Sequence, residues 1–292
     1  MQDTHIYTEH FGLTTRPFSL LPDPDFIYWS PHHENAYAML EYGLMSRAPI
    51  TVITGEIGAG KTTLLREFLR TAPEEYTIGL ISNATGNRGE LLHWVLMSLS
   101  QPVDVNASYV QLFHQFQSFL IEEYAQGRRT LLIFDEAQNL EPETLEELRM
   151  FSNINADQDE LIQLVLFGQP QLRDLIEDPR LVQFAQRIAA EYHLDRMDLA
   201  TVTDYIRHRL THAGAAREIF TDMAFEAVHL ASRGTPRLVN QLCDFALVYA
   251  AMDGEDQVTA DTVTRVVRDR KDYGVFRKDT TRPIPLHVNR GI

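Results

Sequence analysis

One segment restricts the fold of this 292-residue chain more than any other feature. Gly55–Thr62 reads GEIGAGKT, a full match to the pattern G-x-x-x-x-G-K-[ST]. It follows the β-branched run Ile50–Thr54, which predicts a strand, and it leads into Lys61–Arg70, whose apolar spacing predicts a helix. A glycine-rich turn between a strand and a helix points several backbone N–H groups at one place, beside the positive end of the helix dipole. The segment therefore predicts an α/β fold with a phosphate-binding loop.

The residues of this loop have separate expected roles toward a nucleoside triphosphate and Mg²⁺. We expect Lys61 to reach the β- and γ-phosphates and the Thr62 hydroxyl to bind Mg²⁺. No N/T-K-x-D stretch that would recognise guanine is present, which favours ATP. The predicted nucleotide-binding residues are Gly55, Glu56, Ile57, Gly58, Ala59, Gly60, Lys61, Thr62 and Thr63.

An acidic pair ends a second apolar run further along the chain, in the sequence LLIFDEAQ. We expect Asp135 to position Mg²⁺ through its water shell. Glu136, the next residue, is placed to polarise an attacking water as a general base. The alternative is that these acids only cap the helix that follows, but the phosphate-binding loop favours the catalytic interpretation.

Three further residues are candidates for the same site, each with a structural alternative. Gln169 follows an apolar run, and in open α/β sheets ligands bind at the carboxyl ends of strands, so it could orient the lytic water or the γ-phosphate. Its alternative is a turn with Pro170. Arg187 lies between apolar neighbours and could act as an arginine finger, or form a surface ion pair. Arg237, at a helix start, could sense the bound nucleotide, or only cap its helix.

Strand and helix patterns alternate in the first two thirds of the chain, and helical patterns alone follow. The predicted strands are apolar runs separated by helices, which is typical of a parallel sheet covered on both faces. They are Ile50–Thr54, Thr77–Ser82, Thr130–Asp135, Leu161–Gly168 and Ala190–Leu194. The predicted helices are Ala36–Ser46, Lys61–Arg70, Gly89–Leu99, Tyr109–Gln126, Pro142–Asn153, Thr201–Ala213, Asp222–Ser232, Pro236–Met252 and Ala260–Asp269. We expect a lead-in over 1–31, a nucleotide-binding domain over 32–197, a helical domain over 198–272 and a basic tail over 273–292.

The lead-in is rich in proline and aromatic residues. Its prolines, Pro17, Pro22, Pro24 and Pro31, fix φ and exclude helix interiors, so we expect an ordered, extended segment. Its aromatic side chains need a surface, and we expect the body of the nucleotide-binding domain to supply it. His32-His33 follow directly, and two interpretations stay open: they line the adenine pocket, or they begin a helix.

Composition limits the partners and the location. The net charge of −15 argues against a surface that binds polyanions as a whole. The first ten residues lack the basic and apolar regions of a signal peptide, and no apolar run approaches the roughly 18–20 residues that span a bilayer. Cys243 is the single cysteine and is expected to be buried. We therefore expect a cytoplasmic protein.

Basic residues gather near the C-terminus. Two interpretations stay open: these residues form a solvated helix face and tail, or they contact an anionic membrane or nucleic acid. Peripheral contact with the inner membrane is therefore one expectation. The residues are Arg265, Arg268, Arg270, Lys271, Arg277, Lys278, Arg282 and Arg290.

Together, these residues resemble the ExeA/GspA-type AAA+ ATPases of bacterial secretion and envelope assembly, over residues 8–270. The matching segments are Phe11–Leu13, Arg16–Phe18, Pro22–Pro24, GEIGAGKTTLL, Asp135–Gln138, Gly168–Pro170, Gln186–Ile188 and Gly234–Arg237. The resemblance implies a three-layer αβα P-loop AAA+ core with a five-stranded parallel sheet of order 5-1-4-3-2, and a C-terminal helical lid. It also implies ATP-driven homo-oligomers, with Arg187 as the finger that acts across subunits and Arg237 as the lid sensor.

The resemblance also indicates a pathway. Founding members continue past this module into a membrane span and a periplasmic peptidoglycan-binding domain, whereas this sequence has a basic tail and resembles a short form. It implies an ATPase that powers or licenses a cell-envelope export system (type II secretion-like, pilus or exopolysaccharide), with an export or membrane protein as partner. The alternative is a DNA-associated ATPase of the transposition-regulator type, because similar ATPases regulate transposition.

Overall fold

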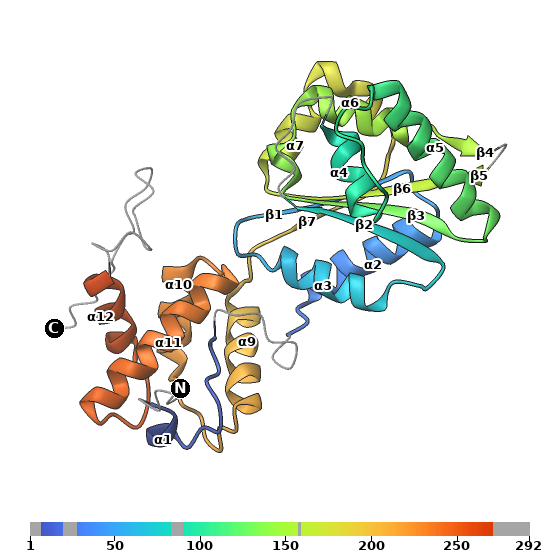
Figure 1. The fold of residues 1–292 in the computed structure, drawn as a ribbon. Helices are drawn as coiled ribbons and strands as arrows, with labels where there is room; N and C mark the ends of the chain where they lie inside the picture. Colours follow the sequence, from blue (N-terminus) through green and yellow to red (C-terminus); the bar gives the residue numbers. More distant parts are fainter. Residues whose placement is uncertain (1–6, 20–27, 83–89, 157–158, 271–292) are drawn as a thin grey trace. The chain divides into compact units, whose positions relative to one another are not determined.

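The computed structural model describes residues 7–19, 28–82, 90–156 and 159–270 (Figure 1). The chain forms two compact units. The sheet-containing unit comprises Pro22–Met197 and the short segment Thr235–Arg237. The helical unit comprises Met1–Leu21, Asp198–Gly234 and Leu238–Ile292. The first residues of the chain are therefore grouped with the C-terminal helices.

Five parallel strands form the main sheet. They are β1 (Ile50–Gly55), β2 (Tyr76–Ser82), β3 (Arg129–Asp135), β6 (Ile162–Gly168) and β7 (Ile188–Leu194). Their order across the sheet is β2-β3-β6-β1-β7. Counted as strands one to five and read from the opposite edge, this is the order 5-1-4-3-2, so the expected topology is confirmed. A short antiparallel pair, β4 (Asn155–Ala156) and β5 (Asp159–Glu160), was not predicted.

Helices cover both faces of this sheet, which confirms the three-layer architecture. Alternate residues of β3 point to opposite sides: Ile133 packs with α2 (Pro31–Met45) and α3 (Lys61–Thr71), and Phe134 packs with the helices of the other face. Those helices are α4 (Leu91–Ser98), α5 (Tyr109–Ala125), α6 (Pro142–Phe151), α7 (Gln171–Ile176) and α8 (Val182–Ala185), with two 3₁₀ turns, η2 (Ala137–Asn139) and η3 (Pro179–Leu181). The short elements between β6 and β7 were not predicted, because a single turn carries too little periodicity.

The predicted start of α2 at Ala36 was wrong, because the helix begins at Pro31. Proline is compatible with the first helical position, where its missing N–H would have no helical partner. The Ser30 side chain caps the helix by accepting a hydrogen bond from the His33 N–H. Most other boundaries agree to within two residues, and the predicted start of α4 at Gly89 lies outside the described residues.

The register of the parallel sheet brings the predicted site residues to one edge. Gly55, at the end of β1, lies opposite Leu194 of β7. Thr54 pairs with Gly168 of β6, so the residue after Gly168 emerges beside the loop that follows β1. In β3, Phe134 pairs with Leu166, which places the end of β3 beside the end of β6.

The helical unit contains α9 (Leu199–His212), α10 (Asp222–Ser232), α11 (Pro236–Asp253), α12 (Ala260–Arg270) and the short α1 (Thr8–Phe11). The expected C-terminal helical region is confirmed. Cys243 is buried in α11. In the described part of the chain, no helix combines the length and the apolarity that crossing a membrane requires.

Three of the eight basic residues near the C-terminus lie in α12, and each has a partner. Arg265 forms an ion pair with Asp253, and Arg268 pairs with Asp269 at 3.3 Å. The guanidinium of Arg270 lies over the ring of Phe245, 3.1 Å from its centroid. The other five lie outside the described residues, so the expected membrane contact of the tail stays a prediction.

The first part of the lead-in packs on the helical unit, so the expectation that it packs on the nucleotide-binding domain was wrong for residues 7–19. The Tyr7 hydroxyl donates to Asp244 of α11 at 2.5 Å. Buried Arg209 of α9 donates from Nε to the carbonyl of Pro17 at 2.6 Å. The fully buried Phe18 packs against Phe220 with ring centroids 6.3 Å apart.

The end of the lead-in packs on the sheet-containing unit instead. Trp29 packs with Tyr37 of α2 in the core of the sheet-containing unit, as expected. The lead-in is therefore shared between the two units. Pro22, Pro24 and Phe26 lie outside the described residues.

Phe18→Ala should destabilise the helical unit, because it removes a ring that is 1% exposed. Truncation of a buried phenylalanine typically costs about 3–5 kcal/mol of unfolding free energy. The quantity to measure is amide hydrogen exchange in α9–α12, which reports the local unfolding free energy. Leu230→Ala is the matched control in α10, because Leu230 is 67% exposed. Equal exchange in the two variants would show that residues 7–19 do not contribute to this unit.

Candidate nucleotide-binding site

The loop between β1 and α3 has a left-handed backbone, which favours glycine, at two positions. Gly58 and Gly60 have φ values of +80° and +103°, and Gly60 is the N-cap of α3. A Cβ on Gly60 would lie 2.4 Å from His33 Nε2, so space as well as conformation excludes a side chain there. The result is a narrow turn that ends at the N-terminus of a helix, which is a favourable arrangement for a phosphate group.

Lys61 is the first residue of α3, and its ammonium lies over its own loop. Nζ donates to the carbonyls of Gly55 at 2.6 Å and Glu56 at 3.0 Å. The residue is 7% exposed, and burial lowers the pKa of its ammonium, while the charges of Glu136 and Asp135 oppose this shift. A buried cation needs negative partners, so an incoming phosphate could replace the two carbonyls.

The two acids at the end of β3 have different surroundings. The Glu136 N–H donates to Asp135 Oδ1 at 2.9 Å, and burial raises the pKa of Asp135. Glu136 itself has φ 57° and ψ 38°, a left-handed conformation that costs a non-glycine residue energy. Hydrogen bonds from Gln169 and Gln138 lower the pKa of Glu136. Glu136 is therefore held as a carboxylate at the edge of the sheet where the loop lies.

Gln169 lies next to Glu136. Its Nε2 donates to Glu136 Oε2 at 3.0 Å, while its backbone carbonyl accepts the Leu172 N–H at 2.9 Å in the turn before α7. The side chain thus reaches the acidic pair, and the backbone forms the turn that was its alternative. Gln138 donates to the same Oε2 at 2.6 Å. Sequence reasoning gave Gln138 no role, although the run DEAQ contained it.

His33 supports the loop from α2. Its Nδ1 lies 2.7 Å from Ser30 Oγ, and its Nε2 lies 3.1 Å from the carbonyl of Ala59. Burial lowers the pKa of His33 and so favours the neutral ring. The Ser30 hydroxyl then donates to Nδ1, and Nε2 carries the proton that is donated to Ala59. His33 lies in the first turn of the helix, as one interpretation expected, and its contact with the loop was not predicted.

The remaining predicted residues are placed as follows. Thr62 is exposed and Thr63 half-buried in the first turn of α3. Arg237 is exposed, in the segment that is grouped with the sheet-containing unit, where its backbone N–H donates to the Gly58 carbonyl at 3.4 Å.

Arg187 lies at the opposite end of the strands from the glycine-rich loop of its own chain. It precedes β7, and its neighbour Ile188 pairs with Ile50 at the start of β1, whereas the loop follows the end of β1. At about 3.3 Å per residue, the length of β7 separates Arg187 from the loop by roughly 20 Å. Its guanidinium donates to the Ser152 carbonyl at 3.4 Å and to Asn153 Oδ1. No ion pair of Arg187 is seen among the described residues.

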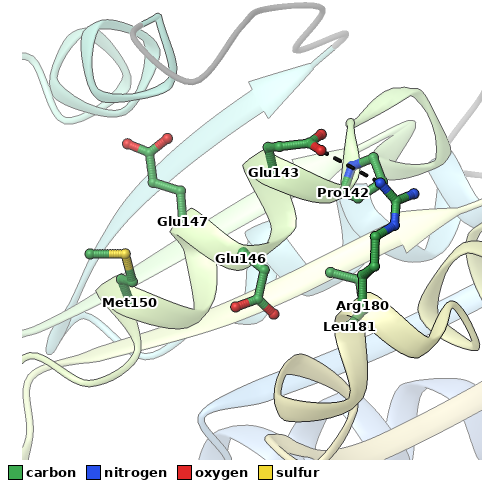
Figure 2. A pocket seen from close by; sticks show the side chains of 7 residues that line it. All are labelled: Pro142, Glu143, Glu146, Glu147, Met150, Arg180 and Leu181. Atoms are coloured by element: carbon green, nitrogen blue, oxygen red, sulfur yellow. Dashed lines mark ion pairs between the residues drawn. The ribbon is translucent and has the colours of Figure 1, made fainter.

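A separate pocket of about 260 Å³ lies between α6 and η3 (Figure 2). Three glutamates of α6 line it, and Arg180 of η3 pairs with Glu143 at 3.6 Å. Its volume is below the roughly 300–1,000 Å³ typical of ligand sites. Its carboxylates would repel a triphosphate, and none of the predicted nucleotide-binding residues lines it.

Comparison with known proteins identifies the type of domain. Residues 44–176 match the family model described as "AAA domain". The chain carries an AAA domain. "General secretion pathway protein A" of Aeromonas hydrophila is 40% identical over 253 residues, which is 87% of this chain and 46% of that protein. The resemblance to the GspA-type proteins is thus confirmed, and the chain spans about half the length of this relative.

Solved structures support the AAA fold. The ORC2 protein of Aeropyrum pernix matches with a TM-score of 0.63 and 18% identity, over 87% of this chain and 71% of that chain. Cdc6p of Pyrobaculum aerophilum matches with a TM-score of 0.62 and 17% identity, over 83% and 67%. At such identities the likeness concerns the fold alone.

The loop geometry predicts that Gly60→Ala abolishes nucleotide binding, because the new Cβ would clash with His33 and oppose the φ of +103°. The matched control is Gly127→Ala, which has a φ of +79° but nothing within 4 Å of the new Cβ. Both variants should lose about 1–2 kcal/mol of stability through the left-handed backbone. Binding of a fluorescent ATP analogue, with the melting temperature measured alongside, separates the two effects. Full binding by Gly60→Ala would contradict the assignment of the loop.

Proposed function

We propose that this chain is an ATP hydrolase that uses Mg²⁺. One observation carries the proposal: a glycine loop with a buried lysine and a carboxylate held by two amides lie at the same edge of the sheet. Lys61 begins the helix that follows β1, and β6 pairs in parallel with both β1 and β3, so the ammonium and the acids at the end of β3 lie at the same end of the sheet. Binding of phosphate and activation of water then take place side by side.

The residues divide the reaction between them. The loop N–H groups and Lys61 bind the β- and γ-phosphates, and the dipole of α3 adds to the attraction. The Thr62 hydroxyl would bind Mg²⁺ and Asp135 would position the ion through its water shell, and the metal would neutralise charge on the phosphate oxygens. Glu136 accepts a proton from the attacking water, and Gln169 orients the water or the γ-phosphate. Arg237 acts as the sensor of nucleotide state.

Full activity requires an assembly of subunits. Arg187 lies about the length of a strand, roughly 20 Å, from the loop of its own chain, so it can reach only the nucleotide of a neighbouring subunit. Its hydrogen bonds to Ser152 and Asn153, just after α6, hold the guanidinium at the amino edge of the sheet. We therefore assign Arg187 as an arginine finger that acts in trans within a homo-oligomer.

The cellular role we propose is assembly or operation of a bacterial envelope export system. The support is the relative named for the general secretion pathway, which is 40% identical over 87% of this chain. The partner is then an export or membrane protein of the cell envelope, and the ATPase acts from the cytoplasmic side. The net charge of −15 supports this role over tracking along DNA, because a surface of that charge repels a polyanion.

Binding and hydrolysis should separate by mutation. Lys61→Ala is expected to abolish ATP binding, because it removes the cation that holds the phosphates. Glu136→Gln is expected to keep binding and lose turnover, because a neutral amide cannot accept the proton. Equilibrium ATP binding and steady-state phosphate release measure the two properties. Hydrolysis by Glu136→Gln at the parental rate would exclude Glu136 as the base.

The specific activity should rise with protein concentration as subunits associate. Arg187→Ala should bind ATP without hydrolysing it, and mixing it with Lys61→Ala should restore part of the activity, since one subunit supplies the finger and the other the intact loop. Arg180→Ala, which removes an exposed arginine paired with Asp178, is the control and should keep the parental rate. Hydrolysis that does not depend on concentration, with no rescue in mixtures, would remove the finger role.

A further inference from the structure

The side chain of Gln138 connects the ends of two neighbouring strands. Its Oε1 accepts the backbone N–H of Gln169 at 2.8 Å, and its Nε2 donates to Glu136 Oε2 at 2.6 Å. A backbone N–H can only donate, so the oxygen of the amide must face Gln169. The nitrogen must then face the carboxylate. Both ends of the amide are used, and its orientation is fixed by its neighbours.

The register of the sheet makes this contact close. Phe134 of β3 pairs with Leu166 of β6, so Glu136 and Gln169 emerge side by side just past the strand ends. A Cβ on Gly168 would lie 3.3 Å from Gln138 Oε1, so the absence of a side chain at Gly168 leaves room for the amide. Gln138 itself is half-buried in η2.

Both amide hydrogen bonds of Glu136 end on the same carboxylate oxygen, Oε2. The donors come from Gln138 at 2.6 Å and from Gln169 at 3.0 Å. Two donors on one oxygen restrict rotation of the carboxylate, and neither of them bonds the other oxygen, Oε1. A left-handed backbone at Glu136 is unfavourable for a non-glycine residue, and these contacts help to hold it.

We propose that Gln138 is a positioning residue for the hydrolysis proposed above: it holds the Glu136 carboxylate in one orientation and ties it to the residue that follows β6. The inference rests on Glu136 acting as the base. The Gln169 N–H holds one end of the Gln138 amide, and the other end of that amide is bonded to Glu136. A shift of Gln169 would therefore move the amide that orients the Glu136 carboxylate, so the orientation of the base depends on the position of the residue after β6. Gln138 makes no hydrogen bond to the loop among the described residues, so its effect falls on the chemical step and spares ATP binding.

Two substitutions of Gln138 test this, with one control. Gln138→Met keeps the length of the side chain and removes both hydrogen bonds. Gln138→Glu keeps an acceptor for the Gln169 N–H and replaces the donor by a carboxylate that repels Glu136. Gln117→Met is the matched control, because Gln117 is also half-buried but lies in the middle of α5. Steady-state ATP hydrolysis, ATP binding and the melting temperature are measured for all of them.

Both Gln138 variants should lose kcat by about 10- to 100-fold, as expected when a reacting group is misplaced, while the KM for ATP changes by less than about twofold. Gln138→Glu should lose at least as much as Gln138→Met. In a Glu136→Gln background, single-turnover hydrolysis should show no further loss on adding Gln138→Met, because the two residues act as one unit. The control should keep the parental kcat.

Parental kcat in both Gln138 variants would overturn this inference alone. So would a loss of ATP binding that parallels the loss of kcat, or a Gln138→Met effect that adds in full to that of Glu136→Gln, since either result assigns Gln138 a purely structural or independent role. A parental protein that does not hydrolyse ATP would overturn the proposed function, and this inference with it.

Discussion

Parallel register is the constraint on which the site depends. β1 is hydrogen-bonded to β6 on one side and β7 on the other, and all three strands run in the same direction. Their carboxyl ends therefore meet at one edge, together with that of β3. The loop after Gly55, the acidic pair and Gln169 occupy this edge because their strands end there. Arg187 precedes its strand and lies at the opposite edge for the same reason.

Opposite charges lie together where these strands end. A lysine ammonium is buried against carbonyl groups, and the charges of the two acids at the end of β3 act on it. Burial alone would favour the neutral amine, and the acids oppose it. The pKa values of the two acids shift in opposite directions, because burial raises the pKa of Asp135 and amide hydrogen bonds lower that of Glu136. The two neighbouring acids therefore differ in how readily they take up a proton.

The helical unit includes the beginning of the chain. Arg209 lies buried in α9, where it donates to the Tyr205 hydroxyl and also to the Pro17 carbonyl, so the lead-in supplies one of its hydrogen-bond acceptors. Tyr7 and Arg16 both contact Asp244, which adds polar contacts at the same surface. The main segment of the sheet-containing unit, Pro22–Met197, thus lies in the sequence between the first segment of the helical unit and the other two.

The sequence by itself determined the loop, the acidic pair, the strand order through its resemblance to known proteins, and the helical C-terminal region. Apart from the strand order, each is a local pattern, because glycine spacing, acidic strand ends and apolar periodicity can be recognised within a short stretch of sequence. Only the tertiary structure decided that Gln138 joins Glu136 to Gln169, that His33 supports the loop, and that residues 7–19 pack on the C-terminal helices. Most of these contacts join residues that are more than twenty positions apart in the chain, as Gln138 and Gln169 are, and all depend on strand register and side-chain direction, which periodicity does not encode.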